Sequence, residues 1–128
     1  MRHLVGGLAV LALAGCTVPY QPLEQEVELL PTDAFDRVAE TVRAVYPRLS
    51  VLDRETFRIQ SAWLPFDDRR AGERRATVYL EGDRTLSVVV ETRYLRVGFW
   101  SGPKWSSPRG DARLERELMA ALVAVLEV

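Results

Sequence analysis

Apolar residues recur every three or four positions in two stretches of this chain, one at residues 33–46 and the other from Asp111 onward. The first stretch, residues 33–46, predicts an amphipathic helix that Thr32 or Asp33 is suited to cap and that Pro47 ends. Its shared apolar face consists of Phe35, Val38, Val42 and Val45. The second stretch predicts a helix that begins near Asp111, whose side chain is placed to cap it. Its apolar face consists of Leu114, Leu118, Ala121, Leu122 and Val125.

Between the two helical stretches, apolar and polar residues alternate, which is typical of strands with one buried face. The strands are expected at residues 49–52, 56–64, 74–81 and 85–97. Gly82-Asp83 lies between the last two and indicates a hairpin turn. The order helix, three or four antiparallel strands, helix predicts an α+β fold, a two-layer sandwich with both helices on one face of the sheet.

The chain has the length of one small domain, and its charges are nearly balanced. It has 128 residues, with 17 Lys and Arg against 18 Asp and Glu, for a formal net charge of -1. A near-neutral chain lacks the basic balance of a nucleic-acid-binding protein, so no nucleic-acid partner is expected. The hydrophobic share of 48% is ordinary for a globular domain and argues against disorder.

The N-terminus has the organisation of an export signal. Residues 1–3 include a positive charge, and residues 4–14 are an uncharged apolar run, too short to span a bilayer but of the length of a secretory signal. The four residues that follow on, Leu13-Ala14-Gly15-Cys16, resemble the lipobox of bacterial lipoproteins. This resemblance implies cleavage between Gly15 and Cys16 and attachment of a diacylglycerol to the Cys16 thiol. The alternative is a free cysteine at the end of a buried helix.

The resemblance also implies a domain organisation and a location. Residues 1–15 are the expected signal peptide, residues 16–31 a lipidated tether with three prolines, and residues 32–128 one folded domain. Residues 27–30 leave a second possibility open, because their apolar side chains could dock as an edge strand. Thr17, which is not an Asp, follows the cysteine, so the resemblance implies an outer-membrane anchor with the domain facing the periplasm.

Removing the signal peptide also removes the only histidine, and Cys16 is the only cysteine. Catalysis by Ser-His-Asp or Cys-His groups and histidine- or thiolate-bound zinc are therefore excluded from the mature domain. Asp67-Asp68 beside Arg69-Arg70 could form a cation or acid–base site, but the balanced charges favour a solvated connection between strands. We expect no enzyme activity, no cofactor and no metal.

The stretch 98–110 is expected to be a loop and has an unusual composition. It contains two of the three tryptophans and the only lysine, and its candidate partner-binding residues are Phe99, Trp100, Lys104 and Trp105. Two interpretations stay open: the aromatic side chains fold back to close the core, or they form a binding surface.

The order of elements looks loosely like that of small accessory domains in envelope lipoproteins. This analogy favours a membrane-tethered, non-catalytic interaction or assembly module of the cell envelope, with an envelope protein as partner. A second hypothesis is a small or lipidic ligand held between sheet and helices, in a cavity lined by Trp63, Tyr79 or Tyr94. A third is a carboxylate-dependent hydrolase, which needs two acidic side chains facing one cleft.

Overall fold

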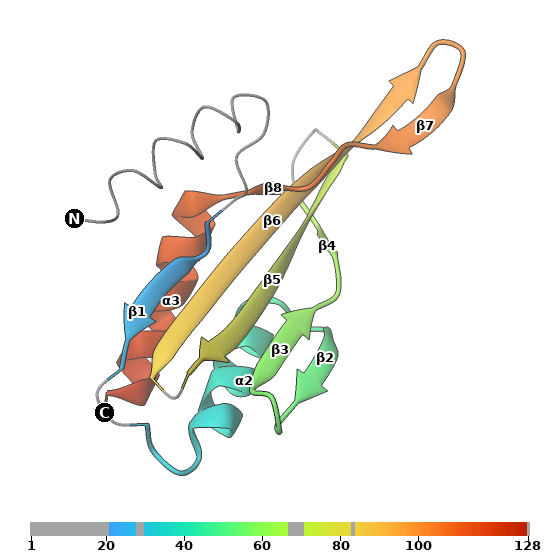
Figure 1. Ribbon diagram of the computed structural model, residues 1–128. Coiled ribbons are helices and arrows are strands. Elements are labelled where there is room, and N and C mark those ends of the chain that lie inside the picture. Colours follow the sequence, from blue (N-terminus) through green and yellow to red (C-terminus); the bar gives the residue numbers. More distant parts are fainter. Residues whose placement is uncertain (1–20, 28–29, 67–70, 83, 128) are drawn as a thin grey trace, which may run out of the picture.

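The computed structural model describes residues 21–27, 30–66, 71–82 and 84–127. Within them, two helices and eight strands follow one another along the chain (Figure 1). Their bounds are β1 (Leu23–Glu26), α2 (Ala34–Val45), β2 (Leu49–Asp53), β3 (Arg58–Ser61), β4 (Leu64–Pro65), β5 (Gly72–Glu81), β6 (Thr85–Gly98), β7 (Gly102–Trp105), β8 (Arg109–Gly110) and α3 (Ala112–Leu126).

All eight strands belong to one antiparallel sheet. Its main path runs β1-β6-β5-β3-β2, while β4 pairs with β5, and β7 and β8 both pair with β6. The long hairpin β5–β6 is the centre of this sheet, with ten consecutive residue pairs from Gly72↔Tyr94 to Glu81↔Thr85. Strand β6 continues beyond this pairing, so that its last residues project from the body of the sheet with β7 alone (Figure 1).

The predicted fold class is wrong in the extent of the sheet. We expected a helix first and three or four strands, whereas the described chain has eight strands and begins with β1. Strand β1 lies within the stretch expected to be a tether, and it pairs with β6 through the register Leu23↔Val88 to Glu26↔Thr85. Strands β7 and β8 lie within the stretch 98–110 that was expected to be a loop. Backbone pairing with β6 creates all three strands.

Both helices pack on one face of the sheet and against each other (Figure 1). Leu86, Val88 and Val90 of β6 point inward and are fully buried, while Ile59 and Val78 continue the same layer on β3 and β5. The helices contribute the rest of the core, chiefly Phe35, Val38 and Val42 from α2 and Leu118, Met119 and Leu122 from α3. This inward spacing of every second residue is the pattern that the sequence shows, and it places Glu73, Arg75, Glu91 and Arg93 on the opposite face.

The helix predictions are confirmed in position and only partly in detail. Asp111 is the N-cap of α3, and its carboxylate accepts a hydrogen bond from the Leu114 amide at 3.1 Å. Asp33 precedes α2 without such a bond, and its carboxylate instead pairs with Arg37 at 3.0 Å. Val45, expected in the apolar face of this helix, is 45% exposed.

Candidate functional site

The end of β6 and the whole of β7 form a two-stranded hairpin that stands away from the sheet, which we call the β6–β7 hairpin (residues 95–105) (Figure 1). Leu95 pairs with Trp105, and the pairing continues to Gly98 and Gly102 on either side of the turn. Gly102 has φ +75°, a left-handed conformation that glycine adopts without steric cost. The turn therefore closes where the sequence supplies a glycine.

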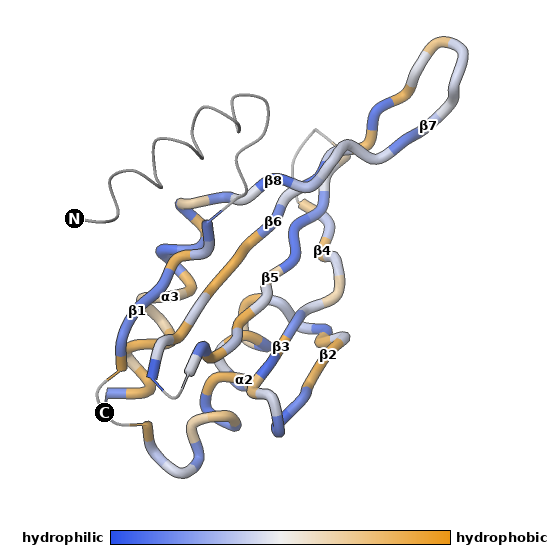
Figure 2. Tube along the Cα trace, in the orientation of Figure 1, coloured by the Kyte–Doolittle hydropathy of each residue, from blue (hydrophilic) through white to orange (hydrophobic). Residues whose placement is uncertain are grey.

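Large apolar side chains at the tip of this hairpin are in contact with solvent. Phe99 is 89% exposed, Trp100 is 91% exposed and Val97 is 76% exposed. The two rings contact each other edge to face, with their centroids 4.8 Å apart. The interpretation that these side chains close the core is wrong for Phe99 and Trp100. Figure 2 shows a short hydrophobic segment at the tip, and hydrophobic and hydrophilic residues in alternation along the projecting end of β6.

At its base, the hairpin is fastened to the sheet by stacked tryptophan and arginine side chains. The Arg93 guanidinium lies 4.0 Å from the ring centroid of Trp63 and 4.3 Å from that of Trp105. Its Nη2 and Nε atoms both donate to one carboxylate oxygen of Glu73, at 2.6 and 3.1 Å. Arg93 thereby joins β5, β6, β7 and the segment after β3, on the sheet face opposite the helices.

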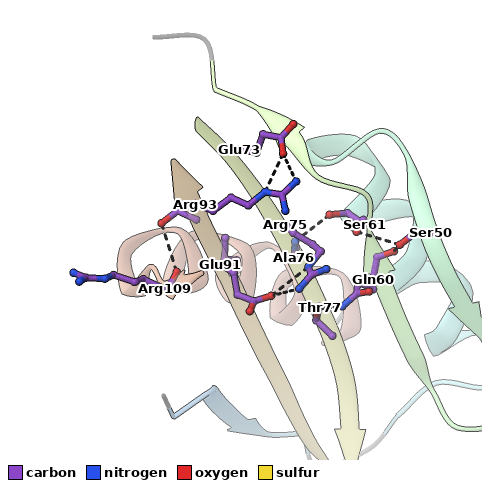
Figure 3. Close-up of polar contacts among 12 residues, drawn as sticks. Ser50, Gln60, Ser61, Glu73, Arg75, Ala76, Thr77, Glu91, Arg93 and Arg109 are labelled. Atoms are coloured by element: carbon purple, nitrogen blue, oxygen red, sulfur yellow. Dashed lines mark hydrogen bonds and ion pairs between the residues drawn. The ribbon is translucent and has the colours of Figure 1, made fainter. Parts of the chain in front are cut away.

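A second arginine extends this arrangement, which we call the tryptophan–arginine stack (Trp63, Arg75, Arg93 and Trp105, with Glu73 and Glu91). The Arg75 guanidinium lies 4.4 Å from the centroid of the Trp63 ring and donates to Glu91 at 2.9 and 3.2 Å. Figure 3 shows the two ion pairs side by side across β5 and β6. Because each acidic side chain binds an arginine, the stack holds its charges in balance.

The strand that returns from the hairpin is joined to β6 by backbone and hydroxyl groups. The Ser106 amide donates to the Tyr94 carbonyl at 2.8 Å, and the Ser106 hydroxyl accepts from the Tyr94 amide at 2.9 Å. Beside these bonds, a surface groove of about 390 Å³ is lined by two arginines and four hydroxyl-bearing residues. Its lining is Thr92, Tyr94, Arg96, Ser106, Ser107 and Arg109.

The candidate partner-binding residues are thus separated by the structure. Phe99 and Trp100 are at the tip, and Lys104 is exposed on β7. Trp105 is 39% exposed and stacks on Arg93 at the base of the hairpin. Gly15 and Cys16, the residues of the expected cleavage and lipidation, lie outside the described residues.

Two other expectations concern charged groups. Asp67 and Asp68 lie outside the described residues, so their expected solvated connection is not placed. In the part of the chain that the structure describes, no three His, Cys, Asp or Glu side chains are arranged to hold a metal ion.

Over the same described residues, no helix has the length and the apolar character needed to cross a membrane.

Two features of the site have no counterpart among the sequence predictions. The tryptophan–arginine stack forms because three paired strands bring outward-pointing side chains together. From the alternation in the sequence, Arg75 and Arg93 can be recognised only as residues of a charged face. Glu115 belongs to the first turn of α3, yet it is 2% exposed, and its carboxylate accepts from the Val90 amide at 2.9 Å. The sequence does contain a sign that Glu115 is buried: it lies four residues after Asp111, on the face of the helix that also carries Leu118.

The residues suggested to line an internal ligand cavity are dispersed. Trp63 is on the sheet face opposite the helices, and Tyr79 on the same face receives the Arg58 guanidinium at 5.5 Å. Tyr94 stacks on Phe66, with ring centroids 5.8 Å apart. The tyrosine that does lie between sheet and helices is Tyr46, 2% exposed, and burial raises the pKa of its phenol.

Comparison with known proteins leaves the site to be interpreted from its own geometry. No protein-family model matches the chain, and no curated protein matches it.

Proposed function

We propose that this chain is a membrane-tethered, non-catalytic interaction module of the cell envelope, and that the β6–β7 hairpin is its contact element. The observation that carries the proposal is the exposure of Val97, Phe99 and Trp100 at the end of a hairpin that is fixed to the sheet. Exposed aromatic clusters on a rigid support are typical of contact surfaces, because their large area becomes buried with little loss of side-chain entropy.

In this proposal the N-terminus anchors the protein and the folded domain makes the contact. Lipid at Cys16 would attach the protein to the outer membrane on its periplasmic side, as the lipobox resemblance implies, and the domain would carry the hairpin. The absence of histidine and of a second cysteine from residues 16–128 supports a non-catalytic role. Glu73 and Glu91, the acidic pair on the outer sheet face, each bind an arginine, which also favours a structural use of these carboxylates.

The test is photocrosslinking in intact cells with a photoreactive phenylalanine derivative in place of Trp100. An aromatic replacement preserves the chemistry of the tip, so a contact made by the hairpin gives a reproducible adduct with protein or lipid. The matched control carries the same derivative in place of Leu52 on β2, which is 53% exposed and also apolar.

An adduct that forms at position 100 and not at position 52 supports the proposal, and its loss when Phe99 is also replaced by Ser would assign it to the aromatic tip. Equal yields at both positions, or none at position 100, would show that the hairpin is not the contact element. Trp100 is the better probe position than Trp105, because replacing Trp105 also disturbs the stack on Arg93.

A further inference from the structure

We infer that the β6–β7 hairpin docks on an anionic phospholipid surface, with its tip and one face at the lipid interface and its cations on the phosphates. This inference rests on the proposed function, since it names the surface that the proposed contact element meets. Four independent observations point to it.

The first observation is the charge of the segment. Residues 92–110 contain four cations and no Asp or Glu, in a chain whose formal net charge is -1. Arg93 is paired with Glu73, which leaves Arg96, Lys104 and Arg109. Among the described residues, no carboxylate lies within ion-pair distance of these three. The hairpin is therefore a cationic projection from a slightly acidic protein.

The second observation is that two of these cations face each other. Arg96 and Lys104 are directly paired across the two strands of the hairpin. Like charges in this position destabilise a strand pair, and here no neighbouring acid compensates them. An anionic surface would remove the repulsion, because phosphate oxygens accept hydrogen bonds from both side chains at once.

The third observation is that the hairpin is amphipathic. Arg96 and Lys104 point to one face, while the alternation of the strands directs Leu95, Val97 and Trp105 to the other. These three side chains are 37%, 76% and 39% exposed, and the tip residues add to them. An apolar face, an aromatic tip and cations on long flexible stems form the combination that lies in the interface of a bilayer.

The fourth observation is that the chain enters the sheet on the side of the hairpin, so that the expected lipid on Cys16 and the hairpin tip are within reach of one membrane. The residues before β1 enter the sheet at Leu23, opposite Val88, at the end of β1 nearer the hairpin (Figure 1). From Val88 to Gly98, β6 covers about 33 Å towards the tip. The seven residues from Cys16 to Leu23 span at most about 25 Å when extended. A lipid on Cys16 and the hairpin tip thus reach the same membrane when β6 is inclined to its surface.

The groove beside the hairpin adds a place for a headgroup. Arg96 and Arg109 line it together with the hydroxyl groups of Ser106 and Ser107, and its volume is about 390 Å³. Guanidinium and hydroxyl groups are the donors that phosphate oxygens prefer. The lipid anchor alone would leave the orientation of the domain free, whereas docking of the hairpin would fix it.

The experiment uses the lipidated protein reconstituted into phosphatidylcholine vesicles, with or without phosphatidylglycerol, that contain lipids with brominated acyl chains. Bromine quenches tryptophan that enters the interface, and the difference between the wild type and Trp100→Phe isolates the signal of Trp100. We expect strong quenching of Trp100 in the presence of phosphatidylglycerol. The double variant R96Q/K104Q should lower the docking equilibrium roughly 30-fold, since each cation near an anionic surface contributes about fivefold.

The matched control is R48Q/R116Q, which removes the same charge from two exposed positions outside the hairpin. It should retain wild-type quenching. Because R96Q/K104Q removes a like-charge pair, its thermal unfolding temperature should be no lower than that of the wild type, so a loss of docking is not a loss of folding.

The inference and the proposed function fail in different ways. Quenching that is absent, or that depends neither on phosphatidylglycerol nor on Arg96 and Lys104, overturns the membrane inference. If position 100 at the same time crosslinks to a protein in cells, the proposed function stands with a protein as the partner. If position 100 forms no adduct of any kind, the proposed function falls as well.

Discussion

Arg93 is expected to control the rigidity of the β6–β7 hairpin, and Arg93→Met tests this with a side chain of similar length and no charge. The substitution removes the cation from between Trp63 and Trp105 and leaves Glu73 without its partner. Each cation–π contact at a partly exposed position contributes about 0.5–1 kcal/mol. The ion pair, with both side chains a little over one-fifth exposed, contributes at most about 1 kcal/mol. The expected total loss is therefore about 2 kcal/mol.

This loss should be divided between the hairpin and the whole domain. Trp105 belongs to β7, which pairs with the projecting part of β6 alone, so its contact with Arg93 stabilises the hairpin locally. The Trp63 and Glu73 contacts connect strands of the main sheet and enter the global free energy of unfolding. We expect the global value to fall by about 1 kcal/mol, and local opening of the hairpin to become about two- to fivefold more frequent.

Hydrogen exchange and urea unfolding measure the two quantities separately. The Ser106 amide, bonded to the Tyr94 carbonyl just beyond Trp105, reports the local opening. Arg93→Lys should lie between the wild type and Arg93→Met, since it keeps the charge and loses the planar stacking. Arg113→Met is the control, because it breaks an exposed pair with Glu117 and should change stability by less than about 0.5 kcal/mol. Exchange at Ser106 that is the same in both methionine variants would refute the reasoning.

Three further predictions concern single groups. Glu115→Ala should lower the free energy of unfolding by about 2 kcal/mol, since it leaves the buried Val90 amide without an acceptor. Glu115→Gln should lower it much less, and equal urea midpoints for the two variants would contradict this. Arg54 holds the pKa of the Asp36 carboxyl below its ordinary value, so this pair stabilises the fold above the unfolded-state pKa and loses its effect as the pH falls through the folded-state pKa. Arg54→Gln should therefore reduce the difference in melting temperature between neutral and acidic solution. A palmitate analogue supplied to cells should label the wild type and not Cys16→Ser, and label on the variant would exclude thioether acylation at that position.

The central strands and both helices could be predicted from the sequence because their patterns arise from burial. The segments 74–81 and 85–97 became β5 and β6, and the expected helices became α2 and α3 within a few residues. In each of these elements one face packs on the core, so the apolar residues had to recur with the period of the secondary structure.

Strands β1 and β7 could not be predicted in the same way, since neither has a buried face to produce a pattern. Strand β1 is largely polar and exposed, and β7 contains Gly102 and Pro103, which are typical of loops. Both form because β6 offers unpaired backbone groups along its edges, and Pro103 is tolerated because β7 is an edge strand. The exposed candidate residues were identified by composition, while their common position on a hairpin depended on this pairing.

The boundary of the core separates the part of β6 that stabilises the fold from the part that belongs to the proposed contact element. At Val90, the β6 amide binds the Glu115 carboxylate and the carbonyl accepts from the Asp111 amide, so the start of α3 covers this edge of the strand. Beyond Thr92 the inward positions of β6 are no longer part of the core. The hairpin that follows therefore adds no buried core, yet it exposes Trp100 and neighbouring apolar side chains to water. A segment whose only use was to join β6 to α3 would favour polar residues at such a tip, so its aromatic and cationic composition argues for a surface that the hairpin meets.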